Sequence, residues 1–315
     1  MRFLITGISG FVGEHLAKEI CMQCPDADIF GLERAIKPFE LYPELNKKIK
    51  IISSDITDAK TIERNIQKIA PDIVFHLAGF ASASGTDREM IFKVNVIGTL
   101  NIIKSLSRLS KRIKVIIVST SYVYGNTPRR AKESDILSPI GIYAESKLEM
   151  EKKALEFAKN FQNVELIIAR SVNHAGPGQR IGFVVPDFAS QIAKLGNNDE
   201  IHVGNVQAKR DFLDVRDVVR AYIILSKSGK KFNVYNVSSG KSVAIKNILA
   251  KLIKISEKNI AIRKDPNKMR ASEINVNCLD NAKIKKLGWK IAYGIDDTLK
   301  ETYVYWRNKI NENCN

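Results

Sequence analysis

The 315-residue sequence has few cysteines and no long apolar run. Its four cysteines, Cys21, Cys24, Cys278 and Cys314, are too unevenly spaced for a disulfide framework, which favours a reducing compartment and predicts a cytoplasmic protein. The Cys21-x-x-Cys24 pair lacks the second ligand pair of a zinc site, so both residues are expected to be buried in a helix. The first apolar run stops at Gly7, so we expect a strand there instead of a signal peptide, and no run reaches the roughly 18 residues of a membrane helix.

Histidines are also scarce, and the basic residues form no stripe. The four histidines are expected to pack or lie on the surface, and no His, Asp or Glu grouping has the spacing of metal ligands. Lys and Arg number 50 against 34 Asp and Glu, a net charge of +16. The basic residues are scattered without interleaved aromatics, so neither nucleic acid nor a membrane is expected as a partner. The charge fits a small anionic ligand or a lysine-rich surface.

Short apolar runs alternate with helix-like segments through the first two thirds of the chain. The predicted strands cover residues 2–6, 28–33, 49–55, 72–79, 114–120 and 164–171, and the predicted helices cover 11–20, 95–106 and 143–158. This alternation predicts an α/β fold with a doubly wound parallel sheet covered on both faces. After about residue 172, Gly-, Pro- and Asn-rich loops predict a smaller C-terminal α/β substrate lobe. We therefore expect domains at 1–172 and 173–315, interleaved and not separable.

A glycine triplet, Gly7, Gly10 and Gly13 in "TGISGFVG", lies between the first predicted strand and the first predicted helix. The first glycine permits a tight turn, the second lets backbone approach a pyrophosphate, and the third lets the helix pack closely on the strand. The N–H groups at the start of the helix then face the anion. This context predicts a Rossmann-type dinucleotide site, with Phe11 and Val12 among its contacts.

Two charged residues at the end of the second strand bear on the choice of cofactor. Glu33 can accept hydrogen bonds from the ribose hydroxyls of NAD(H), which favours that cofactor. Arg34 can bind a 2′-phosphate and leaves NADP(H) open. An exposed ion pair at a strand end is the alternative explanation for both residues. The other expected cofactor contacts are Asp55, placed at the adenine rim, Ile56, Leu77, Ala78 and Ser119.

The fifth predicted strand ends in three hydroxyl residues, Ser119, Thr120 and Ser121, and a Tyr143-x-x-x-Lys147 pair follows. Ends of central parallel strands line the ligand crevice, so we expect these hydroxyls to point at substrate. Residues four apart share one helical face, a spacing that is common by chance. Together with the glycine loop, it predicts hydride exchange at a carbinol or ketone. We expect Tyr143 as acid or base, Lys147 lowering the pKa of Tyr143 and holding the nicotinamide ribose, and Thr120 bonding the reacting oxygen.

Motifs along nearly the whole chain resemble the extended short-chain dehydrogenase/reductase family, specifically its nucleotide-sugar group. They are "TGISGFVG", "DIVFHLAG", "KVNVIGTLNII", "STSYVYG", "YAESK", "YNVSSG" and "MRASE". Two further segments, "NHAGPGQRIGFVVPDFASQI" and "GNVQAKRDF", are similar to GDP-mannose 4,6-dehydratases and GDP-4-keto-6-deoxy-mannose reductases. The resemblance therefore implies a GDP-linked sugar as substrate.

The resemblance also implies roles for residues outside the triad. Asn95 matches the asparagine that supports the proton relay, and Asn173, Arg210 and Arg270 match groups that hold the diphosphate or the sugar. Guanidinium groups suit a pyrophosphate because they bind it bidentately. As alternatives, Arg210 pairs only with Asp211, and Asn95 bonds only helix backbone. The remaining expected substrate contacts are Ser82, Ser121, Tyr122, Val185, Asn205 and Glu273.

One departure from the family pattern narrows the expected reaction. Dehydratases carry Thr-x-Glu where this chain has Tyr122, and a phenol without its own activating cation is a poor substitute for a carboxylate base, so 4,6-dehydration is not expected. The prediction is an NAD(P)-dependent oxidoreductase acting at C4 of a GDP-linked sugar, first of all a reductase of a GDP-4-keto-6-deoxy-hexose. A GDP-hexose or GDP-heptose 4-dehydrogenase with tightly bound NAD, and a 4-epimerase, remain open.

Two further expectations concern turnover and assembly. A protein that only senses NAD would have no use for the intact triad, so we expect an enzyme. Apolar stripes on helices 87–110 and 143–161 predict a homodimer or higher homo-oligomer, since relatives pair these helices; simple burial against the sheet is the alternative.

Overall fold

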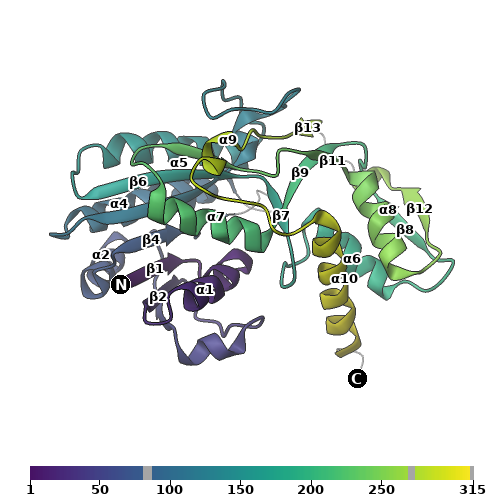
Figure 1. Ribbon diagram of the computed structural model, residues 1–315, viewed down its shortest axis with the longest axis horizontal. Coiled ribbons are helices and arrows are strands. Elements are labelled where there is room, and N and C mark those ends of the chain that lie inside the picture. Colours follow the sequence, from purple (N-terminus) through teal and green to yellow (C-terminus); the bar gives the residue numbers. More distant parts are fainter. Residues whose placement is uncertain (81–86, 269–273, 313–315) are drawn as a thin grey trace.

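A seven-stranded parallel sheet forms the larger part of the molecule (Figure 1). The computed structural model describes residues 1–80, 87–268 and 274–312. The strand order is β10-β6-β5-β4-β1-β2-β3, and every neighbouring pair is parallel. The strands are β1 (Arg2–Thr6), β2 (Asp28–Glu33), β3 (Lys50–Ser53), β4 (Ile73–His76), β5 (Ile113–Thr120), β6 (Val164–Ser171) and β10 (Val234–Val237). This confirms the predicted Rossmann-type fold.

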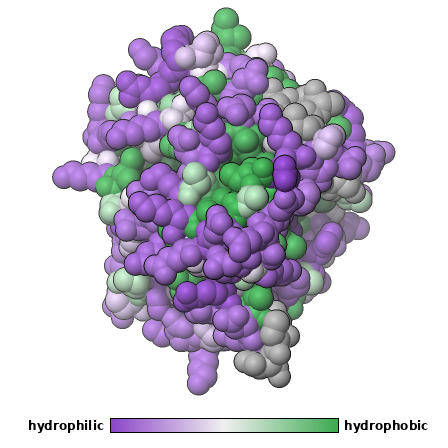
Figure 2. Space-filling model, turned by 90° about the vertical axis from the view of Figure 1, so that its right-hand side faces the viewer, coloured by the Kyte–Doolittle hydropathy of each residue, from purple (hydrophilic) through white to green (hydrophobic). Residues whose placement is uncertain are grey.

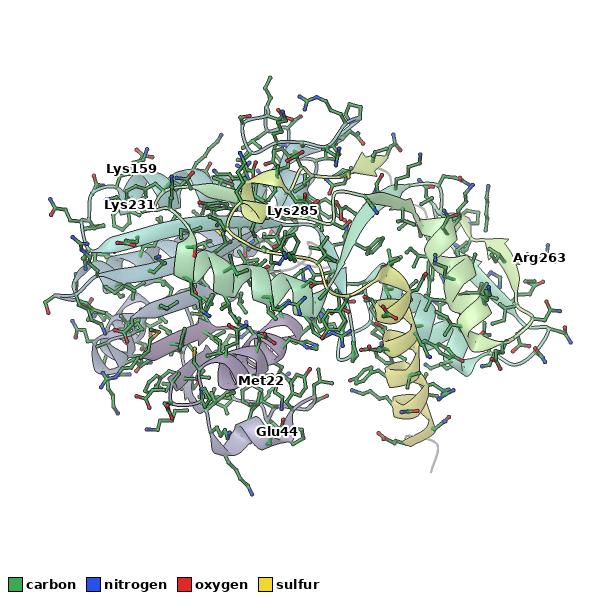
Figure 3. All side chains as sticks on the ribbon, viewed as in Figure 1. Met22, Glu44, Lys159, Lys231, Arg263 and Lys285 are labelled. Carbon is green, nitrogen blue, oxygen red and sulfur yellow. The ribbon has the colours of Figure 1, made fainter. Side chains whose placement is uncertain are left out.

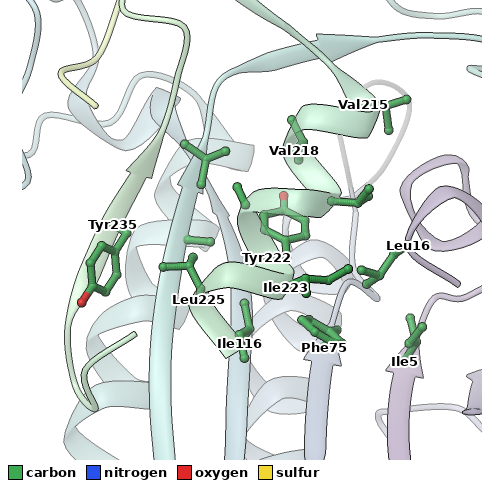
Figure 4. Close-up of a cluster of buried hydrophobic side chains, with 14 of the residues drawn as sticks. Ile5, Leu16, Phe75, Ile116, Val215, Val218, Tyr222, Ile223, Leu225 and Tyr235 are labelled. Carbon is green, nitrogen blue, oxygen red and sulfur yellow. The ribbon is translucent and has the colours of Figure 1, made fainter. Parts of the chain in front are cut away.

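Helices cover both faces of this sheet because its strands are apolar on both sides. Leu4 and Ile5 are both fully buried, but successive side chains point to opposite faces, so they enter different cores. One face carries α1 (Phe11–Gln23) and α7 (Val215–Ser228); the other carries α2 (Ala59–Ile69), α4 (Thr99–Ser107) and α5 (Ile142–Ala158). Figure 4 shows Tyr222 of α7 above Ile116 and Phe75 in the first of these cores.

A smaller lobe follows, as the sequence predicts. Its central strand β9 (Lys209–Asp214) pairs with β7 (Asn173–Ala175), β11 (Ser242–Ala244) and β13 (Val276–Asn277). A separate parallel pair joins β8 (Glu200–Val203) to β12 (Ala261–Lys264). Its helices α6 (Val184–Lys194), α8 (Ile245–Ser256) and α10 (Ile295–Glu312) enclose a third apolar core. In Figure 2 the lobe end of the molecule shows hydrophobic residues gathered in one hollow with hydrophilic residues around it.

Segments from the end of the chain return to the large sheet. Strand β10 joins β6, and helix α7 packs on the sheet, although both come after residue 172. The loop after β5 pairs with the stretch after β13: Thr127 N–H donates to the Val276 carbonyl and Ala131 N–H to the Cys278 carbonyl. The short helix α9 (Ala282–Lys285) follows. The two parts therefore interleave, and the division at residue 172 stays a prediction.

Short helices and turns complete the fold. They are the 3-10 turns η1 (Pro43–Lys47), η3 (Ser121–Tyr124) and η4 (Pro266–Lys268), helix α3 (Arg88–Phe92) and the π-helical turn η2 (Lys93–Gly98). The helix predicted over 95–106 is therefore split into η2 and α4. Cys21 and Cys24 are half-buried at the end of α1, so the expectation that both are buried is wrong; Cys24 is the C-cap, where the helix surface opens to solvent.

Basic side chains are exposed on both parts of the molecule; Lys159, Lys231, Lys285 and Arg263, all exposed, are labelled in Figure 3. The positive charge is thus spread over the surface. None of the helices within the described ranges combines the length and the apolar character needed to cross a bilayer.

Candidate active site

The glycine loop between β1 and α1 has no room for side chains. Gly7 has φ of +75°, and a Cβ atom there would lie 3.0 Å from the Ala78 nitrogen. A Cβ on Gly13 would lie 2.4 Å from the carbonyl oxygens of Gly7 and Ile8. Gly10 is the N-cap of α1 and offers no side-chain hydrogen bond to the helix end. The loop therefore fits the pyrophosphate of a dinucleotide, with the first N–H groups of α1 as donors.

Glu33 at the end of β2 is bound to the glycine loop. Its Oε1 accepts a hydrogen bond of 2.6 Å from the Ser9 N–H, and the side chain is half-buried. Arg34 is exposed. The alternative of an exposed Glu33–Arg34 ion pair does not describe this arrangement, because the carboxylate faces the loop. The contact of Glu33 with a cofactor ribose stays a prediction.

Four other predicted cofactor contacts lie just after β3 and β4. Asp55 accepts hydrogen bonds of 2.8 Å from both the N–H and the hydroxyl of Thr57, and Ile56 is buried. The N–H groups of Leu77 and Ala78 bond the Thr6 carbonyl and hydroxyl, each at 3.1 Å. These residues shape the loop ends of β3 and β4. Their contact with a cofactor stays a prediction.

The structure brings Thr120, Tyr143 and Lys147 together at the carboxyl end of β5. Tyr143 lies in the first turn of α5, and its phenol is hydrogen-bonded to the Thr120 side chain. One turn further along, the Lys147 ammonium donates a hydrogen bond of 3.0 Å to the Val118 carbonyl of β5. Lys147 is only 6% exposed. The helix thus presents both side chains to one strand end.

The ionisation of this pair depends mainly on burial. Burial raises the pKa of Tyr143 to about 12, the Thr120 hydrogen bond lowers it, and the Tyr122 phenol nearby raises it. Burial lowers the pKa of Lys147 to about 8, opposed by the carboxylate of Glu151. In this structure burial has the largest effect on the pKa of Tyr143 and the Lys147 ammonium is bonded to β5, so the lowering of that pKa by Lys147 stays a prediction.

Asn95 lies in the π-helical turn η2 and bridges three parts of the site. Its Oδ1 accepts from the Phe80 N–H at 2.9 Å, and its Nδ2 donates to the Ser146 hydroxyl of α5 at 2.9 Å. A Cβ on Gly79 would lie 2.7 Å from that Oδ1 and 3.5 Å from the Lys147 Nζ. The side chain therefore reaches well beyond its own helix backbone, and such π turns are frequent at functional sites.

His76 at the end of β4 links three elements behind the site. Its Nδ1 bonds the Thr6 hydroxyl at 2.8 Å and its Nε2 bonds the Thr99 hydroxyl at 2.9 Å. Burial lowers the pKa of His76 to about 3, and the positive charge of Lys147 adds to this. The imidazole is thus neutral and holds β1, β4 and α4 together.

Tyr122 and Asn173 face each other on the substrate side. The Tyr122 hydroxyl donates a hydrogen bond of 2.8 Å to the Asn173 Oδ1, and both residues are half-buried. Ser121 is 1% exposed, and its carbonyl accepts from the Asn277 side chain at 3.2 Å. Tyr122, two residues after Thr120, therefore directs its phenol to Asn173.

Strand β9 turns Arg210 and Asp211 in opposite directions. Asp211 is fully buried and accepts hydrogen bonds from the hydroxyls of Ser238 and Ser239 and from the Ser239 and Gly240 N–H groups. Burial raises the pKa of Asp211. Arg210 is half-exposed and bonds the Lys209 carbonyl at 3.0 Å. An Arg210–Asp211 pair is therefore not what positions Arg210.

Other predicted substrate contacts have different surroundings. The Asn205 Oδ1 accepts from the Gln207 N–H at 3.0 Å. Val185 is 2% exposed and packs in the core of the lobe, so its side chain has no free surface for a ligand. Ser82, Arg270 and Glu273 lie outside the described residues.

Ser119 does not face the crevice, which corrects the expectation for its hydroxyl. It is 3% exposed and donates to the buried carboxylate of Glu151, which is paired with Arg170. Sequence reasoning missed Glu151 and Arg170. The available signal was the spacing of Glu151, four residues after Lys147 on the same helical face. Within the described ranges, no three His, Cys, Asp or Glu side chains form a group able to hold a metal ion.

Known proteins match this chain over almost its full length. The model of the family described as GDP-mannose 4,6 dehydratase matches residues 4–302. A GDP-6-deoxy-D-mannose reductase from Pseudomonas aeruginosa is 30% identical, with 99% of each chain covered. A GDP-6-deoxy-D-talose 4-dehydrogenase from Aggregatibacter actinomycetemcomitans is 27% identical over 87% of this chain and 86% of its own.

Solved structures show the same fold. The structure of RMD from Pseudomonas aeruginosa complexed with NADPH has a TM-score of 0.81 at 28% identity, covering 98% of this chain and 99% of its own. A UDP-glucose 4-epimerase from Thermotoga maritima with UDP-glucose has a TM-score of 0.87 at 26% identity, covering 98% and 100%. The fold and site define an extended short-chain dehydrogenase/reductase, a nicotinamide-dependent oxidoreductase of the nucleotide-sugar group. Within it, the chain belongs to the GDP-mannose 4,6-dehydratase family.

Proposed function

We propose that this enzyme is an oxidoreductase acting at C4 of a GDP-linked sugar, and that it reduces a GDP-4-keto-6-deoxy-hexose. The observation that carries the proposal is the placement of Tyr143 beside the Thr120 side chain at the end of β5, with Lys147 one helical turn further along α5 and bonded to the Val118 carbonyl of β5. The reductase and 4-dehydrogenase relatives both act on GDP-linked sugars, as their names say, and this supports the substrate class.

In the direction of reduction, Tyr143 would act as the proton donor. The glycine loop would hold a nicotinamide dinucleotide, which would provide the hydride for C4. Because the pKa of Tyr143 is about 12, its phenol is protonated at neutral pH and is ready to donate. Its O–H bond breaks as a new O–H bond forms on the C4 oxygen, and the Thr120 hydroxyl holds that oxygen in line. The adjacent Lys147 ammonium stabilises the phenolate that remains.

Tyr122 supports chemistry confined to C4. The Tyr122 hydroxyl donates a hydrogen bond to Asn173. Tyr122 also takes the sequence position at which a dehydratase needs a carboxylate to remove a proton from carbon. A GDP-sugar 4-dehydrogenase is the second candidate, favoured by the relative of that name. It would run the same proton transfer in reverse, which requires the pKa of Tyr143 to fall when the cofactor binds. A 4-epimerase would need both directions in turn.

The test uses a GDP-4-keto-6-deoxy-hexose with NADH or NADPH, follows the loss of reduced-nicotinamide absorbance, and determines the C4 configuration of the product by NMR. Tyr143→Phe removes the proton donor and should lower kcat by at least about a hundredfold. Tyr305→Phe on α10 is the matched control and should keep wild-type turnover. If the enzyme turned over only UDP-linked sugars, the proposed GDP-sugar substrate would be wrong. If Tyr143→Phe kept the wild-type kcat, the proposed mechanism would be wrong.

For the cofactor, we propose NAD(H) over NADP(H). Glu33, fixed by the Ser9 N–H, is positioned to accept ribose hydroxyls and to repel a 2′-phosphate. Exposed Arg34 is the group that would favour NADPH, the cofactor in the Pseudomonas aeruginosa structure. Glu33→Gln should lower kcat/KM with NADH and raise it with NADPH, whereas Arg34→Gln should lower only the NADPH value. A wild-type preference for NADPH would contradict the proposal.

For assembly, we propose a homodimer in the cytoplasm. Met90 of α3 and Ile97 of η2 are seven residues apart and each 46% exposed, an apolar strip suited to a second copy. The described cysteines, Cys21, Cys24 and Cys278, are free, which fits a reducing compartment. Ile97→Glu should give a monomer in sedimentation velocity, and the matched loop variant Ile136→Glu should leave the dimer intact. A monomeric wild type would disprove the assembly.

A further inference from the structure

A buried ion pair lies directly behind the catalytic strand end. The Arg170 guanidinium of β6 binds the Glu151 carboxylate of α5 with Nη2–Oε2 at 2.6 Å and Nε–Oε2 at 3.1 Å. Arg170 is 4% exposed and Glu151 is 2% exposed. A fully buried pair of this kind contributes little net stability, because removing both charges from water offsets their attraction. Because the ion pair lies next to the candidate active site, we ask what it does besides stabilising the fold.

The pair is bonded to the elements that carry the catalytic residues. Glu151 accepts from the hydroxyl of Ser119, the residue before Thr120 in β5. Arg170 donates through Nη1 to the Tyr124 hydroxyl at 2.7 Å, which in turn donates to the Asn236 Oδ1 of β10 at 2.8 Å. One carboxylate thus connects α5, β5 and β6.

The spacing on α5 puts Glu151 in line with the reactive side chains. Tyr143, Lys147 and Glu151 follow one another at intervals of four residues, so they share one helical face. Lys147 bonds the carbonyl of Val118, and Glu151 bonds the hydroxyl of Ser119. Two successive turns of the helix are therefore fastened to two successive residues of β5, immediately before Thr120.

We propose that Glu151 is a positioning residue for the reaction: its buried negative charge keeps Lys147 protonated, and its bond to Ser119 fixes α5 in register with the end of β5. The first part rests on the charges that face Lys147. Among the residues that the structure describes, the titratable groups near it are Glu151 on its own helix, with Arg170 of β6 beyond it, and His76 of β4 and Tyr143, which are both neutral. Glu151 is the one anion among these four, and its attraction opposes the burial that favours neutral lysine.

This inference deepens the proposed function, on which it rests for the role of Lys147, but its first test needs no sugar. Protein labelled with ¹³C at the lysine Cε is titrated by NMR, and the Lys147 signal is assigned with a Lys147→Arg variant. The wild-type midpoint should lie near a pH of about 8. In Glu151→Gln the midpoint should shift to lower pH, because the anion is gone. A folded Glu151→Gln protein with an unchanged midpoint overturns the proposal.

Two more variants keep the test decisive. Ser119→Ala removes the bond to β5 but keeps the charge, so the midpoint should stay at the wild-type value. If Glu151→Gln fails to fold, Glu151→Gln/Arg170→Gln removes both charges and leaves amides that can bond each other. Glu151 acts directly on Lys147 and Arg170 lies beyond it, so the midpoint should still shift to lower pH. A midpoint at or above the wild-type value then overturns the proposal.

Kinetics separate positioning from a merely structural role. In Glu151→Gln, kcat should fall by about tenfold near neutral pH, and the alkaline limb of the kcat/KM profile should move to lower pH. Ser119→Ala should lower kcat without moving that limb. A uniform loss across all pH values in Glu151→Gln would contradict the electrostatic part. Failure of the wild type to turn over a GDP-sugar would instead contradict the proposed function, with the NMR titration still valid.

Discussion

The large sheet and the smaller lobe are held together by different forces. In the sheet, central strands such as β5 are apolar on both faces, with Ile116 and Ile117 fully buried in opposite cores. Around the end of β9, where the lobe continues into α7, three carboxylates that are at most 2% exposed accept hydrogen bonds from backbone N–H groups. Asp211 binds Ser239 and Gly240, Asp214 binds Arg216, and Asp217 binds Ala292 and Tyr293.

The difference follows from how backbone groups are satisfied. Parallel strands bond one another, so the sheet needs only apolar side chains to pack against its helices. The irregular segments of the lobe have N–H groups without such neighbours, and buried carboxylates serve as their acceptors. We therefore expect the irregular segments beside the lobe to depend on buried carboxylates, and the central strands of the sheet to depend on shape and apolar contact.

The largest effect should come from removing one of these carboxylates. Asp217→Ala leaves the Ala292 and Tyr293 N–H groups without their acceptor and Arg220 without its partner. The free energy of unfolding should fall by about 3–5 kcal/mol, measured by urea denaturation. The matched control, Asp296→Ala, removes an exposed pair with Lys251 and should cost less than about 1 kcal/mol. Equal losses in the two variants would refute the contrast.

Acid should weaken the sheet half through its two buried histidines. Burial lowers the pKa of His76 to about 3 and that of His15 to about 4, from 6.5. Both are neutral in the fold, so below pH 6.5 unfolding takes up protons, and stability falls with pH until the folded pKa is passed. Each histidine should lower the free energy of unfolding by about 2 kcal/mol when the pH falls to about 5.

A His15→Gln variant isolates one of these contributions. His15 bonds the Tyr42 hydroxyl and the Pro177 carbonyl, each at 3.0 Å, and glutamine can replace part of this without titrating. The variant should lose less stability than wild type between pH 7 and about pH 5 in the same urea assay. An identical loss in both proteins would show that His15 does not stay neutral in the fold.

The smallest effect should come from a conservative change in the sheet. Ile117→Val removes one methylene from a fully buried site, and the free energy of unfolding should fall by about 1 kcal/mol. Ile136→Val, in a loop position 90% exposed, is the control and should have no measurable effect. If Ile117→Val lowered the free energy of unfolding more than Asp217→Ala, the expected order of the two effects would be wrong.

The sequence was a good guide wherever a pattern is local. The apolar runs predict six strands of the sheet, because a strand buried on both faces must be apolar throughout. The glycine triplet predicts a tight loop and the Tyr143–Lys147 spacing predicts a shared helical face, because loop geometry and helical spacing are set within a few residues. The structure then brings these local features together at the carboxyl ends of the sheet strands.

Long-range features could not be predicted in the same way. Nothing in residues 234–237 indicates that β10 returns to the sheet beside β6. The bond of Glu151 to Arg170 joins residues 19 apart in sequence, and both look like ordinary charges in the printed chain. The pKa of Tyr143 depends on how much solvent its neighbours exclude, which spacing does not reveal.

The late return of the chain has a consequence for biosynthesis. Strand β6 has its outer edge open until β10 has left the ribosome, and the loop of Thr127 and Ala131 has no partners until residues 276–278 arrive. A nascent chain of some 230 residues therefore carries an unpaired strand of a nearly complete sheet. Such an edge invites pairing with another chain, so chaperone capture at that length would protect the newly made enzyme from aggregation.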